Sequence, residues 1–507
     1  MKPFKTSKTL LSAVALAVLA ALPAAALAQS LEMGKGGLRL LDAQGGVTDE
    51  FSVRAKRWDQ RRLPDGSMLA LLHDADSNTL RLLEARGGSL RARASWAGPN
   101  LDLEALCLYL EPRQQLLQVF LLGSDGLAEQ WLLTDKPAAN GQSLRQFAAV
   151  PDAKACTVRD DEGQLYIAED RVGLWAFLAD PERAGRTLAA PGLAPQDMAS
   201  WLEARAAVPA PVIPVVVPSA QTAPVRGVGD AADDPAIWVH PSRPAQSRIV
   251  GTDKKRGLAV YDLQGRETQF LPVGRVNNVD IRQGVRAGGR AWDLAVATQR
   301  DQRSVLLFRI DAAGRLEKLA TLPTGLDEVY GICSARHPGG GLDIFVNDKD
   351  GRLLQMRLTR QGKTWRTETV ATLRLDSQPE GCVADEAGHQ LFVGEEKRGL
   401  WRVALDAEGR MGASQLILPI GEVLHADVEG MAVHRNARGA SLVVSSQGND
   451  SFVVLDAHAP FAVKGRFRVG LNTARGIDGV SETDGLDVTA ASLGGAYGEG
   501  LLVVQDG

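Results

Sequence analysis

The chain contains 507 residues, of which 45% are hydrophobic and 23% are charged, and its formal net charge is −4. This composition is that of a globular protein and excludes a mainly disordered, collagen-like or disulfide-dense chain. The charge balance shows no basic excess of the kind that nucleic-acid binding uses, so we expect no nucleic-acid partner. The length allows two or three domains with separate cores.

The N-terminus has the pattern of a secretory signal. Lys2, Lys5 and Lys8 precede an apolar run at 10–22, and the small residues of Ala-Leu-Ala at 26–28 follow. The run is too short for a membrane anchor, which needs about 20 apolar residues. We therefore predict a cleaved signal peptide at 1–28, no membrane association after cleavage, and a secreted or periplasmic protein.

Short β-rich segments alternate with Gly, Asp and Asn turns through most of the rest, for example at 257–265, 341–351 and 391–396. This spacing predicts an all-β sandwich, barrel or propeller. A helical stretch at 195–207 is followed by a run rich in proline, which is typical of a stiff extended linker. We place domains at 29–208 and 226–507, with the linker at 209–225.

The two domains are related by an internal duplication. Residues 155–175 match 381–401, and Cys107 and Cys156 match Cys333 and Cys382 at the same offset. At about 40–50 residues per blade, the second copy has the length of a six-bladed propeller. The first copy is shorter, which predicts a degenerate, incomplete propeller-like domain.

The four cysteines have two interpretations. An exported protein allows one disulfide per copy, Cys107–Cys156 and Cys333–Cys382, and we favour this pairing. Four buried free thiols remain the alternative, since sequence does not give connectivity.

Carboxylates of the second copy gather in short turn-like clusters, and basic side chains follow several of its strand-like runs. The acidic clusters lie at 233–234, 327–328, 395–396, 427–429, 478, 484 and 506, and the basic residues are Lys254, Lys255, Arg300 and Lys349. One such cluster is usually a solvated turn, but many on one face of a propeller would need cations, and Ca²⁺ prefers oxygen ligands. Arg and Lys beside them suit a phosphate-rich substrate.

Ordered motifs resemble the β-propeller phytases. They include Asp-Asp-Pro-Ala-Ile-Trp-Val-His-Pro at 233–241, Asp-Glu-Val-Tyr-Gly at 327–331, Pro-Glu-Gly-Cys at 379–382, Asp-Val-Glu-Gly at 427–430 and Thr-Asp-Gly-Leu-Asp at 483–487, with further matches at 251–261, 277–281, 394–396, 445–449 and 505–507. The resemblance implies a secreted phytase that uses several Ca²⁺ ions. Its substrate would be myo-inositol hexakisphosphate as the calcium complex, attacked by a metal-activated water beside a second phosphate-binding affinity site.

The resemblance also implies roles for individual residues. Ca²⁺ at the cleavage site would be held by Asp233, Tyr330, Glu380, Glu396, Asp427 and Glu429, and structural Ca²⁺ by Asp234, Asp478 and Asp506. The catalytic set would be Lys254, Lys255, Arg300, Tyr330, Lys349, Glu380 and Glu396, in which the four basic residues grip phosphate oxygens.

The first copy lacks most of this set. Lys154 stands at the position of Glu380, Glu104 at that of Tyr330, and Ser124 at that of Lys349. We expect it to be accessory or purely structural. The alternative to a phytase is a non-catalytic, Ca²⁺-stabilised propeller that binds a partner. In either case we expect a monomer.

Overall fold

The computed structural model describes residues 29–134 and 141–507. The predicted signal peptide at 1–28 lies outside the described residues. The chain divides into two compact units, which we call unit 1 (up to Ala210) and unit 2 (Pro211–Gly507). Among the described residues, no helix combines the length and apolar character needed to cross a bilayer.

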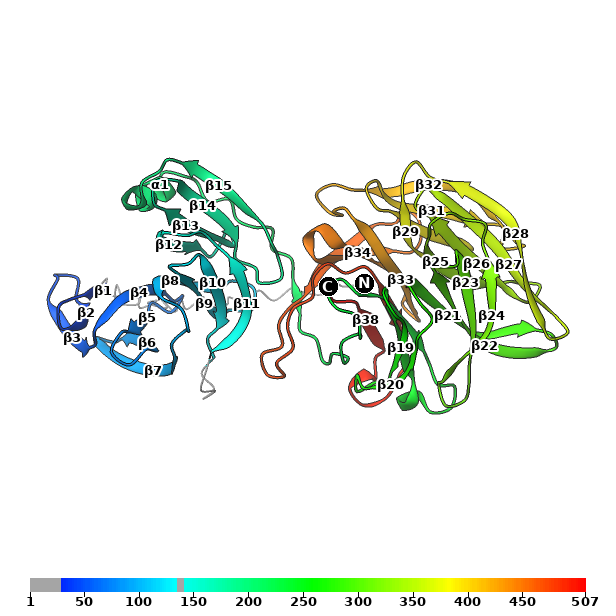
Figure 1. Cartoon of the computed structure of the whole chain (residues 1–507), viewed down its shortest axis with the longest axis horizontal. Helices are drawn as coiled ribbons and strands as arrows, with labels where there is room; N and C mark the ends of the chain where they lie inside the picture. Colours follow the sequence, from blue (N-terminus) through cyan, green and yellow to red (C-terminus); the bar gives the residue numbers. More distant parts are fainter. Residues whose placement is uncertain (1–28, 135–140) are drawn as a thin grey trace, which may run out of the picture. The chain divides into compact units, whose positions relative to one another are not determined.

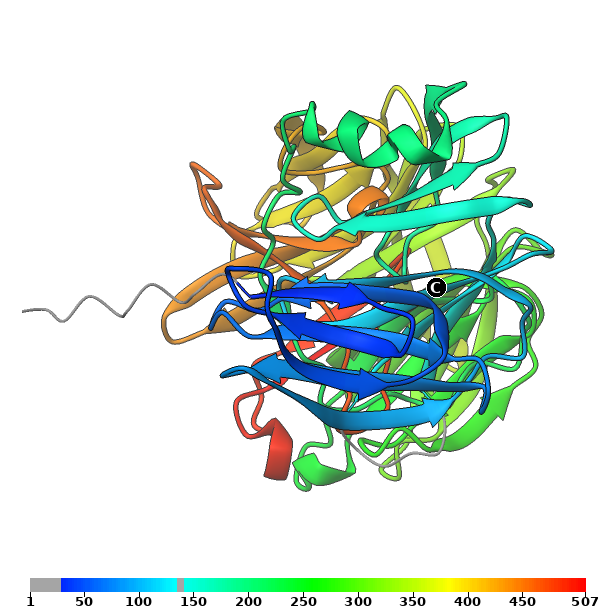
Figure 2. The ribbon, with the colours of Figure 1, turned by 90° about the vertical axis from the view of Figure 1, so that its left-hand side faces the viewer.

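Unit 1 consists of antiparallel sheets in chain order (Figures 1 and 2). Its strands are β1 (Ser30–Met33), β2 (Gly37–Leu41) and β3 (Val47–Ser52); β4 (Ala55–Arg62), β5 (Met68–Asp74), β6 (Thr79–Arg86) and β7 (Ser89–Ala97); β8 (Leu103–Glu111), β9 (Leu116–Gly123), β10 (Leu127–Leu132) and β11 (Gln142–Ala148); and β12 (Ala153–Arg159), β13 (Gln164–Glu169), β14 (Gly173–Leu178) and β15 (Arg186–Pro191). The short helix α1 (Met198–Glu203) ends the unit and packs on β13 and β14.

The first strands β4, β8 and β12 of the three four-stranded sheets pack in that order, as successive propeller blades do. Arg61 of β4 binds them together: its guanidinium donates to the Val158 carbonyl at 3.2 Å and to Asp160 at 3.1 Å, and also to the Leu108 carbonyl. Unit 1 therefore confirms the predicted incomplete, propeller-like domain.

Unit 2 contains six antiparallel blades (Figure 1). Their strands are, blade by blade, β17 (Ala232–Trp238), β18 (Arg248–Asp253), β19 (Gly257–Tyr261) and β20 (Glu267–Leu271); β21 (Val276–Ala287), β22 (Arg290–Gln299), β23 (Ser304–Ile310) and β24 (Leu316–Pro323); β25 (Val329–Arg336), β26 (Leu342–Asp348), β27 (Arg352–Gln361) and β28 (Thr364–Arg374); β29 (Pro379–Asp385), β30 (Gln390–Glu395), β31 (Gly399–Leu405) and β32 (Met411–Pro419); β33 (Val428–Asn436), β34 (Gly439–Ser446), β35 (Ser451–Asp456) and β36 (Val463–Val469); and β37 (Leu486–Thr489) with β38 (Leu501–Val504). The predicted six-bladed propeller is confirmed.

The first strands of the six blades form a closed ring. Each packs on the next, and β37 of blade 6 packs on both β33 and β17. Two hydrogen bonds join blade 6 to its neighbours: the Gly430 amide donates to the Asp484 carbonyl at 2.6 Å, and the Ile237 amide donates to the Asp487 carboxylate at 2.7 Å. The ring therefore closes although blade 6 has two strands where the other blades have at least four.

The apolar core lies between neighbouring blades. Phe308 and Val250 belong to the layer between blades 1 and 2, and Phe452 and Leu486 to the layer between blades 5 and 6. The alternating strand pattern produces this arrangement, because successive side chains of a strand face opposite sides of its blade. Burial of each large apolar side chain stabilises the fold by about 1.5–3 kcal/mol.

The turns between the third and fourth strands repeat one sequence signal, Asp-x-x-Gly. In the turn at 262–265 the Asp262 carboxylate accepts the Gln264 amide at 2.9 Å, and Gly265 adopts a φ of +77°. Such a left-handed conformation favours glycine, and Asp is suited to accept the turn's amides. The same pattern closes the turns at 311–314 and 406–409.

Part of the predicted linker joins the second propeller. Strand β16 (Val215–Val216) pairs in parallel with β36 and adds a fifth strand at the outer edge of blade 5. Proline-rich sequence is compatible with this place, because an edge strand leaves the backbone groups of one side unpaired.

Both units contain one disulfide at the same place in the fold. Cys107–Cys156 joins β8 to β12, and Cys333–Cys382 joins β25 to β29. In each case the bond connects the first strands of neighbouring blades. A partly buried hydrogen bond is also duplicated: the indoles of Trp175 and Trp401 donate to Glu169 and Glu395 at 2.7 and 2.8 Å.

Candidate active site

Each blade of unit 2 brings a polar residue to the same mouth of the ring, at or just before the start of its first strand. We call these six residues the inner ring: Asp233, Asn277, Tyr330, Glu380, Glu429 and Asp484. In blades 1 to 5 the antiparallel register places the turn after the second strand beside the inner-ring residue. In blade 3, for example, Val329 pairs with Asp348, so Lys349 follows next to Tyr330.

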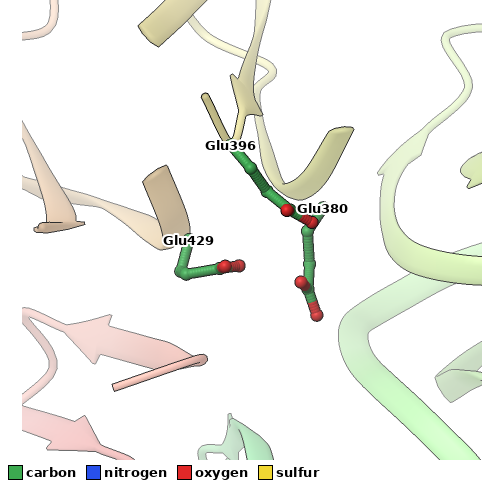
Figure 3. Close-up of side chains that lie close together, drawn as sticks. All are labelled: Glu380, Glu396 and Glu429. Atoms are coloured by element: carbon green, nitrogen blue, oxygen red, sulfur yellow. The ribbon is translucent and has the colours of Figure 1, made fainter. Parts of the chain in front are cut away.

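Three glutamates from two blades form the centre of the site. Glu380 of β29, Glu396 after β30 and Glu429 of β33 bring carboxylate oxygens within 4.8 Å of one another. All three are buried, with Glu380 and Glu429 only 3% exposed. Figure 3 shows Glu396 and Glu429 directed toward Glu380. We call this group the glutamate cluster.

Burial makes the negative charge of this cluster costly. It raises the pKa of Glu396 to about 7, with further contributions from Glu380 and Asp427. Burial also raises the pKa of Glu429 and of Asp233 well above the usual range, and the nearby Glu380 carboxylate adds to both shifts. A cation bound among these groups would favour their charged forms.

Lys254 lies between two acids of the inner ring. Its ammonium contacts Asp484 at 2.6 Å and Asp233 at 3.8 Å, and it also pairs with the exposed Asp230. Burial alone would lower the pKa of Lys254, but the two inner-ring carboxylates outweigh it, and the net shift is upward. Lys254 therefore stays charged and partly neutralises one side of the mouth.

Two further cations lie over Tyr330. The Lys349 ammonium is 4.2 Å from the ring centroid, and the Arg300 guanidinium is 5.5 Å away. Arg300 also reaches the Asn277 side-chain oxygen at 3.5 Å, and the Asn277 amide donates to Glu380 at 2.7 Å. Burial and the surrounding carboxylates raise the pKa of Tyr330, so its hydroxyl remains protonated.

Two of the predicted residues lie at the periphery of this arrangement. Lys255 is exposed, and its ammonium donates to the Val228 carbonyl. Asp427 directly precedes β33 and lies near enough to Glu396 to raise its pKa.

The remaining predicted metal ligands lie around one cavity. Asp478 and Asp506 line this cavity of about 640 Å³, which is also lined by Asp234, by Asp233 of the inner ring, by the 216–225 segment and by β38. Asp234 also belongs to an acidic group with Asp280 and Asp487; its carboxylate accepts the Val279 amide at 2.9 Å, and burial raises its pKa.

Sequence reasoning placed Asn277 and Asp484 in motifs but gave neither a role in the site, although both belong to the inner ring. Asp484 holds Lys254, accepts the Gln447 side-chain amide at 2.6 Å, and has its pKa raised by burial. A signal was present: the pair Asp484-Gly485 repeats the acid–glycine order of Glu380-Gly381 and Glu429-Gly430.

The donors fit a hard cation. All the charged members offer carboxylate oxygens, which Ca²⁺ prefers. Asp233 Oδ1 and Glu429 Oε2 are buried without a hydrogen-bond partner, although such orphan oxygens are uncommon in folded proteins. A bound cation would satisfy both oxygens.

Unit 1 has different contacts at the equivalent positions. Glu104, in place of Tyr330, forms an ion pair with Arg57 at 3.1 Å, and Lys154, in place of Glu380, lies 3.7 Å from Asp152. Two acids are retained: Glu169 stands at the position of Glu395 and binds the Trp175 indole, and Asp170 stands at the position of Glu396 but is exposed beside Arg171. The described part of unit 1 therefore shows no counterpart of the cluster.

The closed ring and its mouth define the class of this molecule: a β-propeller whose centre combines buried carboxylates with lysine and arginine. A family model described as Phytase matches residues 102–192 and 188–507, and so extends into unit 1. The chain belongs to the phytase family and is a phytase.

One curated protein and one solved structure are similar to this chain to different degrees. The 3-phytase of Bacillus subtilis (strain 168) is 35% identical over 300 residues, which cover 57% of this chain and 77% of that protein. A solved structure of a functionally unknown protein from Desulfotomaculum acetoxidans DSM 771 is 10% identical with a TM-score of 0.31, and the match covers 77% of this chain and 92% of that chain. The second likeness is too distant to carry an argument.

Proposed function

We propose that this phytase is a Ca²⁺-dependent hydrolase of myo-inositol hexakisphosphate that takes its substrate as a calcium complex. The observation that carries the proposal is the glutamate cluster, three buried carboxylates within 4.8 Å of one another, beside the cations Lys254, Arg300 and Lys349. A protein that only bound a cation for stability would have no need of basic side chains at the same mouth.

The basic residues bind and orient phosphate. Lys349 and Arg300 both lie close to the ring of Tyr330, which supports their binding phosphate oxygens at the same part of the mouth. Arg offers a planar pair of donors, and Lys a compact charge. Lys254 approaches from between blades 1 and 6, where its ion pairs with Asp233 and Asp484 hold its ammonium in place. These cations stabilise the charge that develops on phosphoryl oxygens during hydrolysis. Lys255 completes the proposed set and contributes to a second phosphate-binding subsite.

The inner ring and its neighbours would hold the metal. Glu380, Glu396 and Glu429 supply the closest oxygens, and Asp233, Asp427 and Tyr330 complete the proposed ligand set. When bound, Ca²⁺ supplies charge neutralisation for the phosphate and increases the acidity of a water molecule at the site. The carboxylates keep the metal in place and orient it toward the phosphate held by the basic residues.

Asp234, Asp478 and Asp506 are proposed to bind further, structural Ca²⁺. Their positions near the junction of blades 1, 5 and 6 support this role, because a cation there would connect the first and last blades. We also propose that the protein is exported and monomeric. The two disulfides support export, because such bonds persist in oxidising compartments.

Phosphate release from phytate tests the central claim. We expect hydrolysis in Ca²⁺ buffer and its loss in excess EGTA, with recovery when Ca²⁺ is restored. Glu429→Gln should lower kcat/KM by about 100-fold or more, because it removes a metal-ligand charge. The matched variant Glu422→Gln changes an exposed glutamate nearby and should retain full activity. Activity that persists after exhaustive chelation would refute Ca²⁺ dependence.

A further inference from the structure

Four of the six inner-ring residues are followed directly by glycine. The pairs are Tyr330-Gly331, Glu380-Gly381, Glu429-Gly430 and Asp484-Gly485, one in each of blades 3 to 6. The repetition spans four blades, so it calls for a common structural cause.

The glycines occupy the contacts between successive blades. A Cβ placed on any of them would lie closer than 3.0 Å to the backbone of the next blade, which real Cβ atoms essentially never do. The nearest backbone atom belongs to the next inner-ring residue: the Glu380 carbonyl oxygen for Gly331, and the Glu429 carbonyl oxygen for Gly381.

The series continues to the closure of the ring. Gly430 packs on the Asp484 carbonyl oxygen, which also accepts its amide at 2.6 Å, and Gly485 packs on the backbone of Asp234 and Asp233. The contacts therefore run from blade 3 through blades 4, 5 and 6 to blade 1. In each contact, the glycine that follows the inner-ring residue of one blade packs against the backbone of the inner-ring residue of the next blade.

Space, and not backbone conformation, requires glycine here. None of the four glycines has a positive φ, so alanine could adopt the same backbone angles. The obstacle is the backbone of the next blade, joined by the Asp234 side chain at Gly485. Asn347 adds to the tight fit between blades 3 and 4: its side chain accepts the Gly331 amide at 2.7 Å and donates to the Glu380 carbonyl at 2.8 Å.

Unit 1 provides an internal comparison. At the positions of Gly331 and Gly381 it has Ala105 and Ala155, on the neighbouring strands β8 and β12. These strands still pack together and share the equivalent disulfide. Two blades of this kind therefore assemble with alanine, and the glycines of unit 2 serve something that unit 1 lacks, which is the glutamate cluster.

We propose that Gly331, Gly381, Gly430 and Gly485 are positioning residues of the active site, which let successive blades approach closely enough for their donors to share one cation. Ca²⁺ binds oxygens at about 2.3–2.6 Å, so a sideways shift of even half an ångström between blades changes its coordination. The buried, unpartnered oxygens of Asp233 and Glu429 lie on the strands that these contacts bring together. The proposal rests on the proposed Ca²⁺ site.

The test compares glycine-to-alanine variants of the full-length protein. Gly381→Ala and Gly430→Ala each place a methyl group against the next blade, and Gly430→Ala meets the milder obstacle, at 2.7 Å. Gly465→Ala is the matched control, because this strand residue of blade 5 has open space around its Cβ position. Calcium binding is measured by titration calorimetry. The part of the Ca²⁺-binding isotherm that is lost in Glu429→Gln is assigned to the inner ring, and we call it the inner-ring component.

We expect both inner-ring variants to weaken that component by about tenfold or more, the cost typical of disturbing residues that orient metal ligands. Because overpacking of this kind is moderately destabilising, their melting temperatures in EGTA should fall by only a few degrees, and Gly465→Ala should change neither quantity. Half-maximal activity should require correspondingly more Ca²⁺, while kcat at saturating Ca²⁺ falls less than in Glu429→Gln.

The other outcomes contradict the inference in distinct ways. Unchanged Ca²⁺ affinity in both variants would show that the close contacts do not set the site. Loss of the fold in EGTA would show that the glycines serve assembly alone, against the comparison with unit 1. If the wild-type protein binds Ca²⁺ at this component without hydrolysing phytate, the proposed function fails, while the calorimetric comparison still decides the role of the glycines.

Discussion

Two adjacent glutamates, Glu395 and Glu396, should respond in opposite ways to the same substitution. Burial raises the pKa of Glu396 from 4.5 to about 7, whereas the Glu395 carboxylate is fully engaged with the Ser377 amide and hydroxyl, both at 2.7 Å, and with the Trp401 indole at 2.8 Å. Glu396→Gln removes a charge that the metal-free protein accommodates poorly. Glu395→Gln instead replaces one accepting oxygen by an NH₂ group, which faces the donors of Ser377 or Trp401.

The magnitude follows from the pKa shift. Each pKa unit corresponds to about 1.4 kcal/mol, so ionised Glu396 costs the metal-free fold about 3 kcal/mol at pH 8. Because the folded-state pKa is raised, the folded protein binds more protons than the unfolded chain between pH 4.5 and 7, and stability falls as pH rises through this window. At pH 5 the same linkage leaves a cost below about 1 kcal/mol.

Thermal unfolding in EGTA at pH 5 and pH 8 measures the effect. We expect Glu396→Gln to raise the melting temperature by several degrees at pH 8 and much less at pH 5, and to abolish most activity in Ca²⁺. Glu395→Gln should lower the melting temperature at both pH values, because a donor inside the protein loses its acceptor. The expected loss in the free energy of unfolding is about 1–3 kcal/mol. A Glu396→Gln variant that is destabilised at pH 8, or stabilised equally at both pH values, would refute the electrostatic reasoning.

Three further outcomes are expected. Lys254→Ala should lower kcat/KM for phytate by about 100-fold, because it leaves Asp233 and Asp484 unpaired. Lys255→Ala should have the smaller effect in the same assay, and equal losses in the two variants would contradict this. Asp484→Asn should raise the Ca²⁺ concentration for half-maximal activity, and an unchanged value would place Asp484 outside the site. Replacing either cysteine pair by serine should destabilise its own unit by about 4 kcal/mol in scanning calorimetry, because both disulfides span the same chain separation of 49 residues. Only loss of Cys333–Cys382, which joins the strands of Tyr330 and Glu380, should also weaken Ca²⁺ binding, and equal effects of the two pairs on Ca²⁺ binding would contradict this.

The repeating features of the fold could be predicted from sequence because each leaves a local signal. Alternating apolar residues mark the strands, Asp-x-x-Gly marks the turns, and the repeated Cys and Gly-Leu-Trp positions mark the duplication. The pairing of β16 with β36 left no such signal, because proline-rich sequence is compatible with both a free linker and an edge strand.

The site was harder to predict, because its geometry depends on contacts between residues far apart in the chain. Motifs pointed to Glu380, Glu396 and Glu429, but they could not show that Asp234 has Asp280 and Asp487 as its neighbours or that Lys255 reaches a backbone carbonyl. Asp484 was noted as an acid but given no role in the site, because an Asp-Gly pair is an ordinary turn signal. Its role depends on the ion pair with Lys254, which lies five blades earlier in the chain.

The donors of the mouth are spread from Asp233 in the first blade to Asp484 in the last, so no fragment of the propeller contains the complete set. The proposed Ca²⁺ site would therefore be complete only after the final blade has docked on the first. Under that proposal, full-affinity Ca²⁺ binding at this mouth would report that the whole ring has been assembled.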